Sequence, residues 1–557
     1  MKSRVSYFDK GVFRTDLTRF APIWVLYGVF GIFTISSFFL QTVDGGFPMG
    51  AMLAEMPLLL VGTNMWLGVA AAVLLFGDLC KSKMCNGLHA MPLRRETWFG
   101  SHFAAGMAYS LIPNTVFAVI LGIMAGADWY MAPLVLLCAT MQYLFFFGVA
   151  LFSIHCSGRS SATVVIFFVI NFFSMMVYWL VESFYMPLLP GVTLDEAIFS
   201  FFSPTIQCYA EPVFKYDVIG DMIDKAKYQF YGFDKGFWYL LGMGAVGIAF
   251  SVLALLLYRK RQLETAGDFI SARGVKPVFL VIYTLCIAAV VQSMLGGLVL
   301  SLPLGLAVGY FTGQMILQRK ANIFNKRAFA GFGLIAGVML VTLLIVGLDP
   351  LGRVKWVPKE EQVKSVSISQ EYYYGFGDNY YTAELTATDP ELQEEIIRLH
   401  QAIVDEGFEG NWLASSYMDY DYWETVPVYL LYEMEDGTKV RRFYSLDMDS
   451  KAAAAAMDFY SKPEYVFGYE DWDAYLSEVT KVEVGYFTFS GQQAKGLLEA
   501  VKADCELGRM SGFYDTYQVK VYVDVIRGEY SDFLHIYENC TNTISWLNTN
   551  APGWQNY

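Results

Sequence analysis

Three side chains that can bind zinc lie close together in the first half of the chain. Cys80, Cys85 and His89 follow a C-x4-C-x3-H spacing, and thiolate and imidazole are the usual ligands of structural zinc. Such a site needs four ligands, and no fourth one is evident. The five histidines contain no i, i+4 pair and no His-Glu-x-x-His motif. We therefore interpret the grouping as accidental and predict neither a metal site nor a catalytic group.

The sequence also lacks the parts that hydrolyse ATP. A Walker A loop needs Gly-x-x-x-x-Gly-Lys-Ser/Thr, because its amides and lysine hold the phosphates, and the chain contains no Gly-Lys dipeptide. Asp419 and Asp421 alternate in a polar stretch and give no sign of paired acid–base work. We expect a protein that is not an enzyme and binds no cofactor itself, so that any ATP is hydrolysed by a partner.

The elements that must position these residues are mostly apolar. Of 557 residues, 55% are hydrophobic and 17% charged, and the mean hydropathy is +0.38, whereas about 25% of residues are charged in a typical soluble domain. Residues 1–350 carry 23 Lys and Arg against 18 Asp and Glu, a net charge of +5, and residues 351–557 carry 16 against 35, a net charge of −19. We predict a basic membrane part and an acidic polar part. The acidic part would repel nucleic acid.

Apolar runs of about 20 residues, the length that crosses a bilayer, predict an α-helical polytopic membrane protein with about nine transmembrane helices. The runs lie near 21–41, 57–78, 103–125, 132–154, 162–184, 236–258, 277–294, 298–317 and 328–348. Residues 1–20 predict a cytoplasmic interfacial helix. Cytoplasmic loops accumulate Lys and Arg, and 19 of the 23 lie on one side if the N-terminus is inside. We therefore expect a multi-pass protein of the cell membrane with an extracytoplasmic C-terminal domain.

Small and polar residues within these runs indicate how the helices pack. Glycines spaced to share a helix face are Gly305, Gly309, Gly313, Gly333 and Gly337. Such faces let helix backbones approach closely, and we favour packing within the bundle over a homodimer face. Asn114 and Asn171 are polar groups at membrane depth, which mark either a substrate path or, as we favour, interhelical hydrogen bonds.

The C-terminal part predicts a domain of the α+β class. A helix is predicted over 389–407, and Asp436-Gly437 predicts a hairpin of strands 426–434 and 439–444. A second round of strand, helix and hairpin is predicted over 482–537, so we infer a weak internal duplication.

Aromatic side chains are dense in the same domain. Trp412, Tyr420, Tyr422 and Trp423 interleave with acidic residues. They could form a surface for a cationic or amphiphilic ligand through cation–π attraction, although we favour rings that line strand faces. Cys505 and Cys540 could form a disulfide if they lie close together, but a buried thiol is the simpler interpretation of Cys505.

Three stretches, together with the basic N-terminus, resemble the permease subunits of ABC-2 type transporters over residues 1–267. They are Met91-Pro92-Leu93-Arg94-Arg95-Glu96-Thr97, Phe202-Ser203-Pro204 and Leu257-Tyr258-Arg259-Lys260-Arg261-Gln262-Leu263-Glu264-Thr265-Ala266-Gly267. The resemblance implies a six-helix permease core at 21–267, a connecting helix along the inner face and a coupling helix in the first cytoplasmic loop. It also implies ATP–Mg on a separate ATPase subunit and a dimer, homomeric or heteromeric, of permeases.

By this resemblance, Arg94, Arg95, Glu96 and Thr97 lie at the element that receives the ATPase stroke. The alternative is that they only follow the positive-inside rule and cap the third span. Residues 268–350, which add three spans, and 351–557, which add the acidic domain, depart from the family pattern. The hypothesis is a bacterial exporter whose outer domain binds or gates. The alternative is a membrane-anchored sensor of a peptide antibiotic or envelope component.

Overall fold

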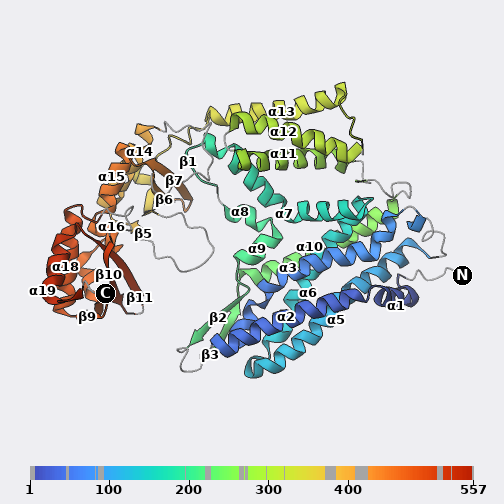
Figure 1. Ribbon diagram of the computed structural model, residues 1–557, viewed down its shortest axis with the longest axis horizontal. Helices are drawn as coiled ribbons and strands as arrows, with labels where there is room; N and C mark the ends of the chain where they lie inside the picture. Colours follow the sequence, from blue (N-terminus) through green and yellow to red (C-terminus); the bar gives the residue numbers. More distant parts are fainter. Residues whose placement is uncertain are drawn as a thin grey trace. The chain divides into compact units, whose positions relative to one another are not determined.

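Two compact units make up the fold. The first consists of Met1–Leu180, Asp195–Val290 and Pro303–Ile335, and the second of Val181–Leu194, Val291–Leu302 and Ala336–Tyr557. The structure, a computed structural model, describes residues 7–45, 49–81, 83–85, 93–194, 196–219, 227–261, 269, 274–295, 298–318, 320–370, 384–407, 425–510, 519–528 and 530–554. Figure 1 labels the helices and strands of both units.

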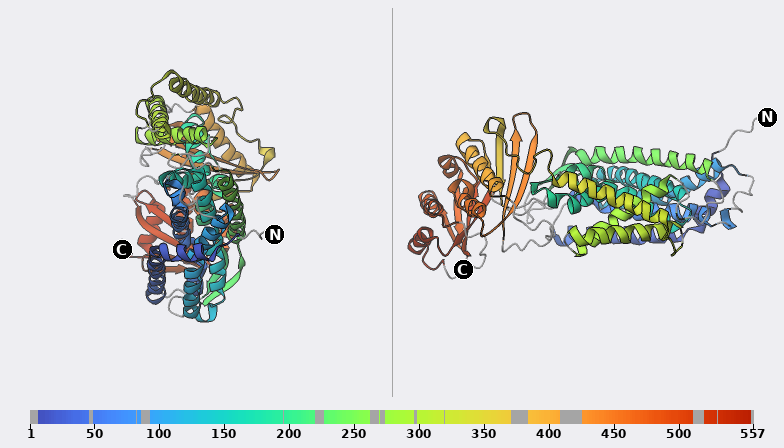
Figure 2. Two further views of the ribbon diagram at one scale, coloured as in Figure 1. Left: turned by 90° about the vertical axis from the view of Figure 1, so that its right-hand side faces the viewer. Right: turned by 90° about the horizontal axis from the view of Figure 1, so that it is seen from above.

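Long apolar helices form the first unit, and many of them run alongside one another (Figure 2). The helices in chain order are α1 (Lys10–Arg19), α2 (Pro22–Gly45), α3 (Met49–Phe76), the short 3₁₀ helix η1 (Gly77–Cys80), α5 (Arg95–Ala125), η2 (Gly126–Asp128), α6 (Met131–Cys156), α7 (Ser160–Phe184), α8 (Glu196–Phe201), α9 (Pro204–Ala210), α10 (Lys235–Lys260), α11 (Val275–Leu295), α12 (Leu298–Gln318) and α13 (Lys326–Gly347). Parts of α7, α11, α12 and α13 belong to the second unit.

The predicted apolar runs correspond to helices of this structure. Among the described residues, eight helices are long and apolar enough to cross a membrane, or nine if the bent pair of α1 and α2 counts as one span. The first predicted run lies on α2, and the other eight lie on α3, α5, α6, α7, α10, α11, α12 and α13. The adjoining runs at 277–294 and 298–317 are two separate helices.

Helix α6 is the centre of the first unit and packs closely on both α3 and α10. A Cβ atom added at Gly68 of α3 would lie 2.9 Å from the backbone nitrogen of Phe147. One added at Gly247 of α10 would lie 2.5 Å from the carbonyl oxygen of Leu144. Small residues therefore bring the backbones together, at positions that the sequence analysis did not single out.

A β-hairpin closes the end of the bundle at which α3 begins. Strands β2 (Phe214–Ile219) and β3 (Lys227–Phe233) pair antiparallel. The Tyr216 hydroxyl donates to the Glu55 carboxylate at 2.8 Å, and a Cβ atom at Gly50 would lie 2.4 Å from the Tyr228 ring. The hairpin was not predicted, because the sequence between its two strands contains neither Asn-Gly nor Asp-Gly.

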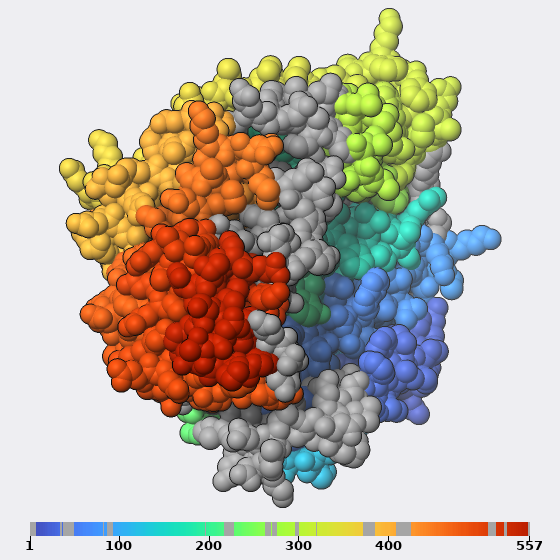
Figure 3. Space-filling view, turned by 60° about the vertical axis from the view of Figure 1, so that its left-hand side comes forward, coloured from blue at the N-terminus to red at the C-terminus, as the bar shows by residue number. Residues whose placement is uncertain are grey.

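The second unit contains two antiparallel sheets. Their strands are β1 (Gly191–Val192), β4 (Val363–Ser369), β5 (Glu384–Ala387), β6 (Thr425–Met434), β7 (Lys439–Asp447), β8 (Lys481–Val484), β9 (Phe487–Ser490), β10 (Val519–Arg527) and β11 (Tyr530–Tyr537). The orders are β1-β7-β6-β4-β5 and β11-β10-β8-β9. Without β1, the two orders are equivalent strand for strand. The surfaces of the two halves, orange and red, adjoin in Figure 3.

Helices occupy equivalent places in the two halves. They are α14 (Pro390–Glu406) and α15 (Lys451–Tyr460) in one half, α18 (Gln492–Glu506) and α19 (Thr541–Asn550) in the other, and α16 (Pro463–Phe467) and α17 (Trp472–Glu478) between them. The predicted helix at 389–407 is confirmed as α14, because Asp389 accepts from the Glu391 nitrogen at 3.1 Å and Gly407 has a φ of +79°. The predicted hairpin is confirmed as β6 and β7, with Gly437 at a φ of +81°.

Within the second unit, the ends of three of the long helices are joined to one another. Gln292 of α11 donates to the carbonyl oxygen of Ser183 at the end of α7 (2.8 Å). The Tyr185 hydroxyl lies 2.8 Å from that of Thr342 in α13. The chain that follows α7 then supplies β1, which pairs with β7. Residues far apart in sequence thus complete one sheet.

Candidate functional site

The start of α5 carries the four residues that the resemblance assigns to coupling. Arg94 is the residue before the helix and is exposed, whereas Thr97 is buried. The Ser101 hydroxyl donates a hydrogen bond to the carbonyl oxygen of Thr97 at 2.8 Å. Arg95 and Glu96 are partly buried, and both contact α10. Of the four residues, Arg94 is the one most accessible to a partner.

Arg95 and Glu96 join the start of α5 to the end of α10. The Arg95 Nη1 atom donates to the carbonyl oxygens of Tyr258 (2.9 Å), Arg259 (3.1 Å) and Arg261 (3.0 Å). The last carbonyls of a helix lack donors within the helix, so the guanidinium caps α10. Glu96 forms an ion pair of 3.0 Å with Arg259. These two residues therefore have structural partners within the chain.

A second guanidinium joins three more elements at this end. Arg261 donates from Nη1 to the carbonyl oxygen of Ile154 in α6 (2.9 Å) and from Nη2 to that of Leu79 in η1 (3.3 Å). In the sequence, Arg261 is one residue of the Leu257–Gly267 stretch that carries the resemblance, and no separate role was predicted for it. Together, Arg95 and Arg261 hold the start of α5, the ends of α6 and α10, and η1, which follows α3, as one assembly.

Helix α1 is attached to the same end and lies at 59° to α2. Asp16, 4% exposed, accepts from His102 Nδ1 at 2.6 Å, and its carbonyl oxygen accepts from the Tyr109 hydroxyl at 2.7 Å. Arg19 forms an ion pair of 3.0 Å with Asp78 of η1. In the sequence, Asp16 reads as an interruption of an apolar face. The structure explains it as the contact that fixes α1 to α5.

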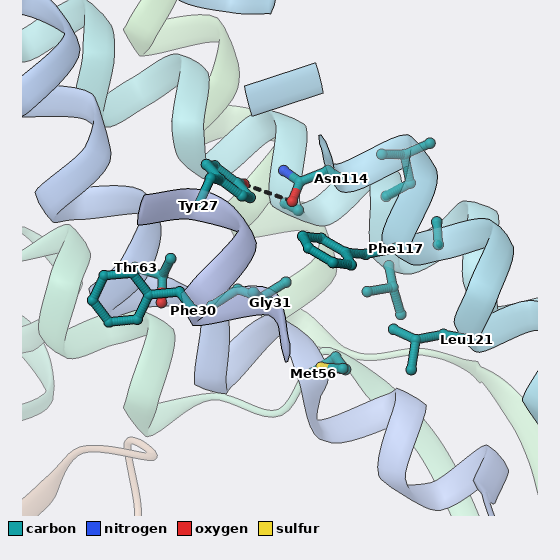
Figure 4. Close-up of a pocket in the computed structure, with 13 residues that line it drawn as sticks. Tyr27, Phe30, Gly31, Met56, Thr63, Asn114, Phe117 and Leu121 are labelled. Carbon is teal, nitrogen blue, oxygen red and sulfur yellow. Dashed lines mark hydrogen bonds between the residues drawn. The ribbon is translucent and has the colours of Figure 1, made fainter. Parts of the chain in front are cut away.

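A small apolar pocket lies between α2, α3, α5 and α6 (Figure 4). Its volume is about 40 Å³, and most of its wall is apolar. Labelled side chains around it are Tyr27, Phe30, Met56, Thr63, Asn114, Phe117 and Leu121. The ring of Phe117 packs directly against the backbone of α2 at Gly31, where a Cβ atom would lie 2.0 Å from that ring.

Asn114 is a polar side chain in the wall of this pocket. Its Oδ1 atom accepts from the Tyr27 hydroxyl of α2 at 2.6 Å, and its Nδ2 atom donates to the Ser110 hydroxyl at 3.1 Å. Asn114 thus makes an interhelical hydrogen bond and also lines the pocket. Asn171 lies on α7 outside the pocket wall, and its Nδ2 atom donates to the Phe167 carbonyl oxygen at 2.8 Å. The structure does not bring the two asparagines together.

A further buried polar pair was missed in the sequence. Gln142 of α6 donates to the carbonyl oxygen of Pro57 at 2.7 Å and accepts from Asn64 of α3 at 3.0 Å. Both side chains are at most 1% exposed. Amides within apolar runs were the available signal, and only Asn114 and Asn171 were considered.

The predicted glycine faces divide into two groups. Gly305 is buried, and Gly309 and Gly313 face α11: a Cβ atom at Gly309 would lie 2.7 Å from the Thr284 carbonyl oxygen. Gly333 and Gly337 of α13 have no atom of the described chain within 4 Å of such a Cβ position.

The remaining candidate residues from the sequence are four cysteines, one histidine and four aromatic side chains. Cys80 and Cys85 are buried, and the described residues contain no group of three or more His, Cys, Asp or Glu suited to a metal. Cys505 and Cys540 are both free and buried, so no disulfide joins them. His89 and the four aromatic residues Trp412, Tyr420, Tyr422 and Trp423 lie outside the described residues.

Comparison with protein families, with characterised proteins and with solved structures gives no match for the chain. The features that bear on function are therefore the pocket and the end of the first unit that carries Arg94, Arg95 and Arg261, which we call the basic end.

Proposed function

We propose that the chain is the membrane subunit of an ABC-2 type exporter, driven by a separate ATPase subunit and paired with a second permease subunit in the cell membrane. The observation that carries the proposal is the basic end of the first unit. There α1, bent away from α2, is fixed to α5 by Asp16 and His102, and Arg94 is exposed at the start of α5. This arrangement suits a connecting helix beside a coupling element.

The contacts behind Arg94 support a mechanism for coupling. Arg95 ties the start of α5 to α10, and Arg261 ties α10 to α6 and η1. A displacement applied at Arg94 would therefore reach several helix ends at once, because charge-assisted hydrogen bonds resist separation. The partner supplies ATP–Mg and hydrolyses it, and this chain converts the displacement into a rearrangement of its helices.

The substrate class that we propose is hydrophobic, peptide or lipid-like. The pocket supports only the apolar character of the path, because its wall is mostly apolar and its volume of about 40 Å³ admits no more than a small group. The substrate would move outward, and the acidic domain at 351–557 would bind or gate it on the outer side.

The test is ATPase coupling in a membrane preparation. The tagged chain is purified from its native membrane together with any protein that carries Walker motifs, and ATP hydrolysis is measured for wild type and Arg94→Glu. Arg327→Glu, an exposed arginine at the start of α13, is the matched control. We expect Arg94→Glu to lower hydrolysis or association several-fold and Arg327→Glu to leave both unchanged.

Two results would contradict the proposal. One is a chain that purifies without any ATPase, or with a kinase, as a membrane-anchored sensor would. The other is an Arg94→Glu variant whose ATPase activity and assembly match those of wild type.

A further inference from the structure

Arg442 of β7 is a buried cation for which the described residues provide no ion pair. Its side chain is on the inner face of the sheet, and the residue is 4% exposed. The Nη2 atom is 3.5 Å from the carbonyl oxygen of Trp356, at the limit of a hydrogen bond, and the Nε atom has no hydrogen-bond partner among the residues that the structure describes. A buried charge without a partner is costly, so this position calls for an explanation.

The ring side chains near Arg442 are neutral, and the charged groups that act on it electrostatically are Asp349 and Arg353. Its guanidinium carbon lies 5.2 Å from the centre of the Trp356 ring. His400 is hydrogen bonded to the hydroxyls of Tyr432 (2.9 Å) and Tyr444 (2.7 Å). Burial, with a smaller contribution from the Arg442 charge, lowers the pKa of His400 to about 3, so the imidazole is uncharged at neutral pH.

Asp349, the acidic residue that attracts Arg442 electrostatically, already accepts hydrogen bonds from the backbone. Asp349 favours the charged form of Arg442, but its two carboxylate oxygens accept from the backbone nitrogens of Arg353 and Val354, each at 2.9 Å. The guanidinium therefore keeps donors of a fixed fork geometry, which matches carboxylate and phosphate oxygens.

We propose that Arg442, with the Trp356 ring beside it, binds an oxyanion, specifically a phosphate group. The position indicates where such a group comes from. Asp349 follows the end of α13 by two residues, and β1, which follows α7, pairs with β7 at Arg442. If the chain spans a membrane as proposed above, both segments leave the bilayer here, so the phosphate belongs either to an outer-leaflet lipid headgroup or to a free solute.

The experiment uses the full chain, purified in detergent and stripped of lipid. Its melting temperature is measured against inorganic phosphate at constant ionic strength, for wild type, Arg442→Gln, Arg442→Lys and the control Arg441→Gln, which removes an exposed arginine next to it. We expect phosphate to raise the melting temperature of wild type and of Arg441→Gln. Arg442→Lys should need at least about tenfold more phosphate, and Arg442→Gln should not respond.

A second arm identifies the source of the phosphate. The same variants are reconstituted in phosphatidylglycerol or in a galactolipid that lacks phosphate. A lipid headgroup is supported if wild type is more stable than Arg442→Gln in phosphatidylglycerol but not in the galactolipid. A solute is supported if wild type responds to inorganic phosphate in detergent. The proposal is overturned if wild type and Arg442→Gln respond equally in both arms.

The melting temperature without phosphate separates binding from a purely structural role. Loss of an uncompensated buried charge should leave Arg442→Gln at least as stable as wild type in phosphate-free detergent. A large decrease there would mean that Arg442 holds the sheet together, and would also overturn the proposal. The detergent arm involves no ATPase, so failure of the exporter proposal would leave its result unchanged.

Discussion

The Nδ1 atom of His102 lies 2.6 Å from a carboxylate oxygen of Asp16, and both side chains are almost fully buried. This contact, between residues 86 positions apart in the sequence, fixes α1 across the start of α5. A helix of ten residues is marginally stable alone, so α1 depends on such contacts for its position.

Replacing His102 by leucine should therefore loosen α1. Asp16 would be left buried without its donor, at a cost of about 1–3 kcal/mol, whereas His102→Asn keeps a donor and should cost less. The measurement is thermal unfolding in detergent, together with the accessibility of a cysteine placed at exposed Thr15. Equal stability of the two variants would contradict this role.

Arg95 should behave differently from Arg94. Arg95→Met removes the donor that caps three carbonyl groups of α10 and should lower stability by about 1.5–3 kcal/mol, the usual contribution of hydrogen bonds to a charged group. Arg94→Met removes an exposed charge and should change stability by less than about 0.5 kcal/mol. Chemical unfolding of the two variants compares them directly. A destabilised Arg94→Met variant beside an unaffected Arg95→Met variant would reverse the assignment.

The Tyr27–Asn114 hydrogen bond can be measured by a double-mutant cycle. Tyr27→Phe and Asn114→Leu each remove one partner, and the coupling energy should be about 0.6 kcal/mol, the average for polar contacts between membrane helices, and at most about 1.7 kcal/mol. A coupling energy near zero would mean that the bond does not join α2 to α5. A loss of transport in Tyr27→Phe at unchanged stability would instead assign the pair to the substrate.

The second unit should lose stability in mild acid. The pKa of His400 is lowered to about 3 in the folded state by burial and by Arg442, against about 6.5 when unfolded. Between these values the unfolded chain binds more protons, so stability falls as pH falls. Acidification from pH 7 to pH 5 should cost about 2 kcal/mol.

The control for this prediction is His400→Gln, whose stability should decrease much less over that interval, because only the contribution of His535 then remains in this unit, whose pKa burial also lowers. Paired carboxylates such as Glu433, whose pKa is lowered by Lys364, act in a separate window below their unfolded pKa of about 4.3. Unfolding followed by tryptophan fluorescence at pH 7, 6 and 5 distinguishes the contribution of His400 from that of the carboxylates. A slope shared by wild type and His400→Gln would contradict the assignment.

Much of the fold was predictable because its signals are local. Apolar runs long enough to cross a bilayer correspond to the long helices, and Asp389 and Gly407 mark the two ends of α14. Asp436-Gly437 likewise marks the β6–β7 turn. In each case a few neighbouring residues determine the backbone conformation.

The site was less predictable because its contacts are between distant segments. Asp16 reads as a break in an apolar face until His102 is placed beside it. The carbonyl groups that Arg95 caps are at least 163 residues away and carry no signature in side-chain type. Arg442 reads as one of two arginines in a strand, and only alternation along β7 decides which of them is buried.

Strand β1 has a consequence for how the protein can be made. Thr193, the residue after β1, donates from its hydroxyl to the carbonyl oxygen of Arg441 in β7, 248 residues later. The strand that pairs with the outer edge of β7 is therefore β1, which is synthesised long before β7. A fragment that begins after α13 would lack this strand and expose the edge of β7, and open edges recruit other chains into aggregates. The biogenesis of the acidic domain is therefore bound to that of the helices that precede it, and a soluble fragment for crystallisation would have to carry β1 grafted beside β7.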